Sequence, residues 1–267
     1  MKRPPRSATL RLRSGPSRAK SRDEASAERQ GLVPLNRALS KLGILSRARA
    51  TTAIRDGRIR VNGRVETNPL RLVIPEQASI DLDGGRAAAR SWRTILLHKP
   101  RGSVTTRHDP ERRPTVFDVI ERAGGDSGGL VSVGRLDLAT TGLLLLTTDT
   151  RLANRLTDPV NGVARVYVAT VRGRVTPDEA ARLEQGIGSG TERIRADSVT
   201  IRKASGRESH VTVELREGKN REVRRLFDAI GHEVTRLKRV AFGGLELGDL
   251  APGQWRELTR EDVASLV

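Results

Sequence analysis

Residues 134–147 read Gly134-Arg135-Leu136-Asp137-Leu138-Ala139-Thr140-Thr141-Gly142-Leu143-Leu144-Leu145-Leu146-Thr147. The second half of this stretch is almost wholly apolar and predicts a strand. The first half is a polar loop bounded by glycines, and its acid, Asp137, stands just before that strand. Such an acid is held on a rigid support and faces the surface, as a reacting group must. Taken alone, however, Asp137 is more often a turn or cap residue.

The sequence around this stretch predicts a strand-rich region over residues 92–267. One helix is expected at 151–156, one begins at the capping box Thr176-Pro177-Asp178-Glu179, and one ends at Gly231. Many strands, few helices and no regular alternation favour an α+β domain with a largely antiparallel sheet. The expected strands are 94–98, 130–133, 142–147, 165–171, 193–202, 209–215 and 234–240.

A smaller unit is predicted over residues 33–83. Apolar residues at helical spacing indicate a helix from Leu35 that stops at Gly43, and Ser46 caps a second helix that runs to Gly57. Asn62-Gly63, inside an alternating run, indicates a type I′ hairpin. Strands follow at 72–74 and 79–82, and residues 84–90 have the composition of a linker. Residues 1–30 have too few large apolar residues for a core, which predicts a disordered basic tail.

Charge is concentrated in the first third of the chain. The formal charge is +17, and residues 1–90 hold 20 Lys or Arg against 8 Asp or Glu, whereas residues 91–267 hold 29 against 24. A sign excess of this size favours a polyanionic partner, with nucleic acid as the default. In the 33–83 unit the candidate phosphate contacts are Arg37, Lys41, Arg47, Arg49, Arg60 and Arg64.

Composition also excludes several classes of protein. Without cysteine there are no disulfides, thiolate zinc sites or cysteine nucleophiles, and the four histidines show no metal-ligand spacing, so we expect no metal centre. The longest unbroken apolar run, Leu143–Leu146, is far too short to span a bilayer, and no secretion signal is evident. We expect a soluble, cytoplasmic protein without a membrane partner.

Two resemblances sharpen these expectations. Residues 33–83 resemble an S4 RNA-binding domain, in which basic side chains face structured RNA. The resemblance is carried by the Ser46-Arg47 step and by the run Gly57-Arg58-Ile59-Arg60-Val61-Asn62-Gly63. Residues 134–147 closely resemble the catalytic motif of pseudouridine synthases, specifically the Rsu family of ribosomal RNA enzymes, which begin with an S4 domain.

Three further segments match the same family in the same order. Residues 97–102 resemble its Asn-Lys-Pro-x-Gly segment, with His98 where Asn is usual. Residues 165–168 resemble its Lys-x-Tyr-x-Val strand, with Arg165 in place of Lys. Residues 217–225, continuing to 239, resemble its final motif. The whole match spans roughly residues 33–260, and the two substitutions leave positions 98 and 165 without a specific expected role.

The resemblance implies roles for individual residues. Asp137 would be the catalytic carboxylate, Tyr167 would lie against the target uracil, and Arg224 would orient Asp137 through a salt bridge. Tyr167 could instead be a core residue, and Lys219 or Arg221 could be the true partner of Asp137. The residues expected to contact RNA are Arg135, Lys99, Lys219 and Arg221, together with Ser46 and the basic residues of the 33–83 unit.

Isomerisation of uridine to pseudouridine involves no redox change and no external energy source, so no cofactor is expected. The uridine must be extruded from folded RNA into a pocket. Attack on the base, attack on the sugar and proton abstraction at the ribose all stay open for Asp137. Residues 220–225 favour large-subunit RNA, and the expected partner of a monomeric enzyme is ribosomal RNA or a pre-ribosomal particle. A non-catalytic RNA-binding or ribosome-assembly protein is the alternative; a hydrolase would need a metal cluster or acid/base pair.

Overall fold

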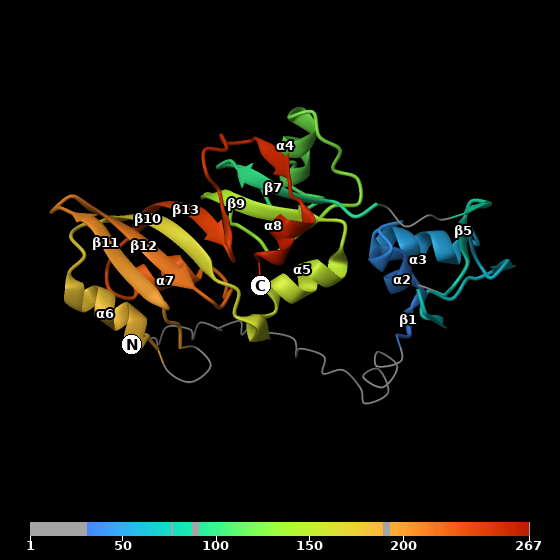
Figure 1. The fold of residues 1–267 in the computed structure, drawn as a ribbon, viewed down its shortest axis with the longest axis horizontal. Coiled ribbons are helices and arrows are strands. Elements are labelled where there is room, and N and C mark those ends of the chain that lie inside the picture. The colour runs from blue at the N-terminus through green and yellow to red at the C-terminus, as the bar shows by residue number, and fades with distance from the viewer. Residues whose placement is uncertain (1–30, 76, 87–90, 189–192, 267) are drawn as a thin grey trace, which may run out of the picture.

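The computed structural model describes residues 31–75, 77–86, 91–188 and 193–266. They form two parts with separate hydrophobic cores, one built from residues 33–82 and the other from residues 95–266 (Figure 1). The predicted disordered tail, residues 1–30, lies outside the described residues. Within the described ranges no helix is both long and apolar enough to cross a membrane.

The N-terminal part contains the two predicted helices, α2 (Leu35–Lys41) and α3 (Arg47–Arg55). The Ser46 hydroxyl accepts a hydrogen bond from the Arg49 backbone N–H at 3.3 Å, which confirms the predicted cap. The core between the helices and the strands is formed by Leu35, Leu39, Ile54 and Ile59, all fully buried.

The strands of this part form two small sheets. The larger has the order β3-β2-β5-β6, made of β2 (Ile59–Val61), β3 (Arg64–Val65), β5 (Ile80–Leu82) and β6 (Gly85–Arg86). The smaller pairs β1 (Val33–Pro34) with β4 (Leu72–Val73). Positive φ angles at Asn62 (51°) and Gly63 (79°) confirm the type I′ turn between β2 and β3.

The expected linker is shorter than the sequence indicated. Gly85 and Arg86 pair with Leu82 and Asp81 of β5, so the first residues of the expected linker belong to a hairpin of the N-terminal part. Residues 87–90 lie outside the described residues.

The C-terminal part is built on one large sheet of order β11-β12-β10-β13-β9-β7-β15, with β8 added to β9 and β14 to β13 (Figure 1). Its pairings are antiparallel except β13 with β9, which confirms the expected largely antiparallel sheet. The strands are β7 (Thr94–Lys99), β8 (Val131–Ser132), β9 (Thr140–Thr147), β10 (Arg165–Arg172), β11 (Ser198–Ala204), β12 (Glu208–Leu215), β13 (Val234–Phe242), β14 (Leu245–Glu246) and β15 (Trp255–Glu257).

Helices cover both faces of β7 and β9. Figure 1 shows α5 (Thr150–Thr157) and α8 (Arg260–Ala264) near these strands, with α4 (Val116–Arg122) elsewhere along them. Leu143 and Leu145 belong to the core that includes residues of α5, while Leu144 and Leu146 belong to the core that includes residues of α4. This burial on both sides explains the unbroken apolar run. Helices α6 (Pro177–Gln185) and α7 (Glu222–Asp228) cover one face of the β10–β13 end, and a short 3-10 turn, η1 (Pro159–Asn161), follows α5.

Candidate active site

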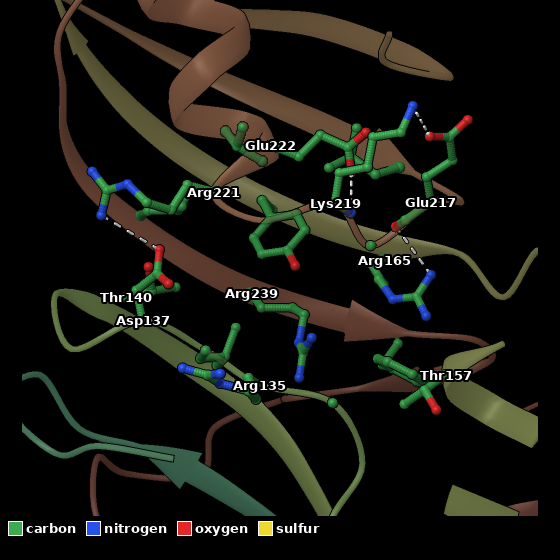
Figure 2. A pocket seen from close by; sticks show the side chains of 18 residues that line it. Arg135, Asp137, Thr140, Thr157, Arg165, Glu217, Lys219, Arg221, Glu222 and Arg239 are labelled. Atoms are coloured by element: carbon green, nitrogen blue, oxygen red, sulfur yellow. Dashed lines mark hydrogen bonds and ion pairs between the residues drawn. The ribbon is translucent and has the colours of Figure 1, made fainter. Parts of the chain in front are cut away.

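A cavity of about 150 Å³ opens where the loop before β9 meets β10, β13 and the segment before α7 (Figure 2). Residues from five separate stretches of the chain meet here, so only the folded sheet assembles the site. The lining side chains that the argument uses are Arg135, Asp137, Thr140, Arg165, Tyr167, Lys219, Arg221, Glu222, Leu237, Arg239 and Phe242.

Asp137 stands at this cavity in a loop that is fixed by its backbone. The Thr105 hydroxyl donates to the carbonyl oxygen of Leu136 at 2.9 Å, and the Gly102 N–H donates to that of Leu138 at 2.9 Å. The Thr140 N–H closes a turn onto the carbonyl of Asp137 itself at 3.0 Å. Its side chain remains 34% exposed. Asp137 is therefore a turn residue in its backbone, while its carboxylate remains available for chemistry.

Lys99 lies beneath this loop rather than at the RNA surface. It is fully buried, and its ammonium donates to the carbonyl oxygens of Thr140 at 3.0 Å and Pro100 at 3.1 Å. Burial lowers the pKa of Lys99 to about 8, and the charge of Asp137 opposes that shift. The expected RNA contact of Lys99 is incompatible with this position, so we correct its role to support of the Asp137 loop.

The cation nearest Asp137 is Arg221, whose Nη1 lies 3.8 Å from Oδ2 (Figure 2). Arg221 has a left-handed backbone, with φ of 51°, at the start of α7. The expected salt bridge from Arg224 is replaced by a hydrogen bond of its Nη1 to the carbonyl oxygen of Val234 at 2.7 Å. Burial and the charge of Arg221 lower the pKa of Arg224, and the charge of Asp137 raises it. Arg224 therefore influences Asp137 through its charge, while its hydrogen bond goes to the Val234 carbonyl oxygen.

Lys219, the other alternative, is also engaged elsewhere. Its ammonium pairs with Glu217 at 2.6 Å and donates to the carbonyl oxygen of Arg193 at 2.7 Å. Lys219 lines the cavity, but its ion-pair partner is Glu217 and not Asp137. Arg135, by contrast, is exposed beside Asp137, where an RNA contact is possible.

Tyr167 lies on β10, opposite Arg239 of β13 and Val213 of β12. It is half-buried, packs against two of the hydrophobic cores and lines the cavity. The ring therefore contacts the core and also borders the cavity, and the expected contact with the target uracil stays a prediction.

Arg165 and Arg239 are two buried cations that line the cavity, and both guanidinium carbons lie over the ring of Phe242, 5.2 and 5.1 Å from its centre. The Arg165 guanidinium donates to four carbonyl oxygens, those of Leu156, Val163, Arg216 and Glu217. Burial lowers the pKa of Arg165, and the charge of Arg239 lowers it further. Arg165 therefore ties the end of α5 to the loop after β12.

Thr140, Glu222 and Arg239 are among the lining residues that received no role from the sequence. Each has a buried side-chain atom without a hydrogen-bond partner in the described structure: Thr140 Oγ1, Glu222 Oε1 and Arg239 Nη2. Burial also raises the pKa of Glu222. The positions of Thr140 and Arg239 follow from strand register, in which Leu237 pairs with Thr140 and Arg239 with Gly142, and no local sequence pattern reveals this register.

The expected RNA contacts of the N-terminal part are spread over its surface. Arg37, Lys41 and Arg47 line a hollow that Arg135 of the C-terminal part also lines. Ser46, Arg49, Arg60 and Arg64 are exposed outside that hollow, and Ser46 acts as a helix cap. The structure thus brings a subset of these residues towards the cavity.

The chain matches two family models, the RNA pseudouridylate synthase model over residues 93–229 and the S4 domain model over residues 33–73. An RNA pseudouridine synthase of Aquifex aeolicus, itself uncharacterized, is 36% identical over 235 residues, which cover 88% of this chain and 93% of the relative. A ribosomal large subunit pseudouridine synthase B of Pseudomonas aeruginosa is 41% identical over 86% of this chain, and the match covers 60% of that longer relative.

A solved structure supports the same assignment. The crystal structure of a pseudouridylate synthase superposes with a TM-score of 0.62 at 27% identity, covering 88% of this chain and all of the other. The fold, both family models and the similarity over most of the chain agree with the resemblance seen in the sequence. The chain therefore belongs to the RNA pseudouridine synthase family, as a Rsu-type isomerase with an S4 domain ahead of its pseudouridine synthase domain.

Proposed function

We propose that this isomerase converts a specific uridine of large-subunit ribosomal RNA to pseudouridine, with Asp137 as the catalytic carboxylate. One observation carries the proposal: a loop fixed at three backbone points presents the Asp137 carboxylate to a cavity, beside the guanidinium of Arg221. The name of the Pseudomonas aeruginosa relative supports the large subunit as the source of the substrate, as does the sequence of residues 220–225.

The chemistry needs few groups. The bond between N1 of the uracil and C1′ of the ribose breaks, the uracil turns, C5 bonds to C1′ and loses its proton, and N1 takes up a proton from water. Asp137 acts at this reacting centre, Tyr167 provides a flat wall for the base, and Arg221 offsets the charge of Asp137 when RNA phosphates approach. A target uridine must leave its stack to reach such a cavity.

Binding of the RNA relies on both parts of the chain. Exposed Arg135 and Arg221 can hold phosphates next to the extruded nucleotide, and the basic N-terminal part can hold RNA farther along. The proposed substrate is ribosomal RNA or a pre-ribosomal particle, and the proposed enzyme is a cytoplasmic monomer.

The test is a map of the pseudouridines of both ribosomal RNAs in a host strain that lacks this protein. We expect at least one pseudouridine of the large-subunit RNA to disappear, to return with the wild-type gene and to stay absent with Asp137→Asn. An unchanged map would refute the proposed function. A site restored by Asp137→Asn would instead show that the carboxylate of Asp137 is not needed to form it.

The same variant serves in vitro. Asp137→Asn keeps the size of the side chain but removes the carboxylate, so its single-turnover rate should fall by about a thousandfold or more while folding and RNA affinity survive. The rate is measured as tritium release from RNA that carries uridine labelled at C5. A loss of at most about tenfold, equivalent to about 1.4 kcal/mol in the barrier, would exclude Asp137 as the catalytic group.

A further inference from the structure

A second basic hollow lies outside the cavity of Asp137, has a volume of about 530 Å³ and shares no lining residue with that cavity. Glu208 and Thr235 line it in part. Four exposed arginines from separate segments also line it, namely Arg101 after β7, Arg172 at the end of β10, Arg207 between β11 and β12, and Arg236 in β13. We call this place, defined by its four arginines, the far hollow.

The positive charge of the far hollow is only partly balanced by acids. Three of its four arginines, all except Arg172, form no side-chain hydrogen bond or ion pair within the described ranges. Arg172 lies 3.2 Å from Glu233, but the two side chains are 73% and 62% exposed, and such pairs are weak. Glu208 has its Oε1 3.3 Å from Nε2 of His210. An anion in the far hollow would therefore meet several guanidinium groups whose donors are available.

Strand alternation brings two of these arginines to one face of the sheet. Val171 and Leu237 belong to the core that includes residues of α6 and α7. Arg172 follows Val171, and Arg236 precedes Leu237. Neighbouring side chains of a strand point to opposite faces, so both arginines point away from that core. The far hollow therefore opens on the face of the sheet opposite α6 and α7.

The far hollow approaches the Asp137 loop through Arg101. The next residue, Gly102, donates its backbone N–H to the carbonyl oxygen of Leu138 at 2.9 Å, just after Asp137. The hollow that Arg135 shares with α2 and α3 reaches the same loop just before Asp137, and the two hollows share no lining residue. Figure 1 shows β11 and β12 at the opposite end of the molecule from α2 and α3. Two basic hollows thus flank the loop of Asp137.

We propose that the far hollow binds phosphate groups of the substrate RNA on the opposite side of Asp137 from the N-terminal part. The inference rests on the proposed function, because that function makes RNA the substrate. A guanidinium group presents paired N–H donors that match the oxygens of a phosphate. Phosphate contacts carry no base information, but they fix the register of a nucleic acid on a protein. Contacts on both sides of the cavity thereby determine which nucleotide reaches Asp137.

A polynucleotide fits the far hollow better than a small anion does. The hollow carries four arginines against one acid, and the arginines are exposed. Salt screens exposed charges, so a single small anion binds weakly at such a place. Phosphates linked in one chain bind with a high effective concentration once the first of them is held, and the N-terminal part already supplies basic residues for that first contact.

The test compares two double variants that lose the same charge. Arg207→Gln with Arg236→Gln removes two arginines of the far hollow. The control, Arg122→Gln with Arg182→Gln, removes two exposed arginines of α4 and α6 that do not line it. RNA affinity is measured at several salt concentrations. The RNA is the large-subunit fragment found by the mapping experiment or, if that map is unchanged, a set of fragments that together cover both ribosomal RNAs.

We expect the far-hollow variant to bind at least fivefold more weakly than wild type at about 0.15 M salt. Its slope of log affinity against log salt should be smaller by about 1.4 to 1.8, as for the loss of two phosphate contacts. The control should bind within twofold of wild type and keep its slope, although its net charge is the same. Both variants should melt at the temperature of wild type, because the replaced side chains are exposed.

The outcomes separate this inference from the proposed function. Equal affinities and slopes for the two double variants would show that the far hollow holds ordinary solvated charges, and would refute it as an RNA site even where wild type converts the RNA. A far-hollow variant that melts well below the control would refute it too, because the arginines would then be structural. If the variants differ as expected but wild type converts no RNA, the far hollow is supported and the proposed function fails.

A cross-linking experiment locates the RNA that reaches the far hollow. The chain has no cysteine, so Arg207→Cys, Arg47→Cys and Arg182→Cys each give one attachment point for a photoreactive label. We expect the labels at positions 207 and 47 to react with different nucleotides, on either side of the target uridine, and the label at position 182 to react little. Reaction at position 207 no more frequent than at 182, or with the same nucleotides as at 47, would overturn the proposal.

Discussion

Gly142 lies so close to the backbone of Arg239 that a Cβ atom at position 142 would be 2.1 Å from the Arg239 carbonyl oxygen. Gly142 also has a backbone φ of 108°, a value that residues with a Cβ atom rarely adopt. This contact belongs to the parallel pairing of β9 with β13, which places the loop of Asp137 beside the strand that carries Arg239. The absence of a side chain at position 142 therefore allows the Asp137 loop and the strand of Arg239 to lie side by side.

Gly142→Ala should be strongly destabilising, because both the clash and the positive φ oppose a side chain. We expect a loss of about 3 kcal/mol or more in the free energy of unfolding, measured by denaturant titration. Gly231→Ala is the matched control, since Gly231 has a φ of 83° but no atom within 4 Å of the place that a Cβ would take. The control should lose only about 1–2 kcal/mol, and an equal loss in both variants would contradict the role of the close contact.

Replacing Arg221 and replacing Arg224 should have different effects on the reaction rate and on the melting temperature. Arg221→Ala removes the ion pair and should lower the single-turnover rate at least tenfold with little change in melting temperature, because Arg221 is 55% exposed. Arg224→Ala removes a partly buried bond to Val234 and should mainly lower the melting temperature. Equal kinetic losses at unchanged stability would return the orienting role to Arg224.

Arg165 should be a structural residue. Arg165→Met leaves the four carbonyl oxygens that it bonds without their donor, and we expect a loss of about 3 kcal/mol or more in the free energy of unfolding. Arg165→Lys keeps a charge and three N–H donors, so it should lose clearly less. Denaturant titration of both variants decides, and equal losses would mean that the guanidinium geometry itself is required.

Local chemistry predicted most elements of the fold. The turn at Asn62-Gly63 and the capping box of α6 depend on neighbouring residues alone, and both were confirmed. The same signal stands in the sequence at α4 and α8, whose capping boxes are formed by Thr115 with Asp118 and by Thr259 with Asp262. The sequence prediction of only three helices in the C-terminal part was therefore wrong for a reason that the sequence itself contained.

The contacts of the site were less predictable than the motif. Family resemblance singled out Asp137 and Tyr167, but the distinction between Arg221 and Arg224 depends on the folded chain, in which Arg221 pairs with Asp137 and Arg224 bonds to Val234. Burial of Lys99 depends on the Asp137 loop folding over it. The unpaired atoms of Thr140, Glu222 and Arg239 depend on packing between distant segments, so composition and spacing could not reveal them.

The buried Lys99 should make stability depend on pH. Its pKa is about 8 in the folded protein against 10.5 for the free side chain, so between these values the unfolded chain binds more protons and stability rises with pH. Such a shift corresponds to about 3 kcal/mol. Below about pH 8 the full cost of burying the charge is present, and above about pH 10.5 it is gone.

Lys99→Met removes this titration at similar volume. We therefore expect the free energy of unfolding of wild type, relative to Lys99→Met, to increase between about pH 8 and pH 10.5. Denaturant titrations of both proteins at several pH values in this window provide the measurement. Parallel curves would show that the ammonium of Lys99 is not destabilised by its position.

The two parts of the chain should contribute separately to RNA binding. Their hydrophobic cores share no residue, so a protein that begins at Ser91 should retain a cooperative unfolding transition. Residues 1–90 hold 20 of the 49 Lys and Arg residues and 8 of the 32 acids. The slope of log affinity against log salt scales with the number of phosphates that a protein neutralises, so the shortened protein should show a shallower slope.

A second shortened protein, which begins at Gly31, lacks the tail but keeps the N-terminal part with its S4 domain, called the S4 part below. Residues 1–30 hold nine Lys or Arg against three acids, so the tail could contribute to salt dependence without any folded surface. We expect the protein from Gly31 to keep most of the slope, because Arg37, Lys41 and Arg47 are fixed on folded helices near Arg135. If the slope falls as far at Gly31 as at Ser91, the tail carries the phosphate contacts and the S4 part does not touch the RNA.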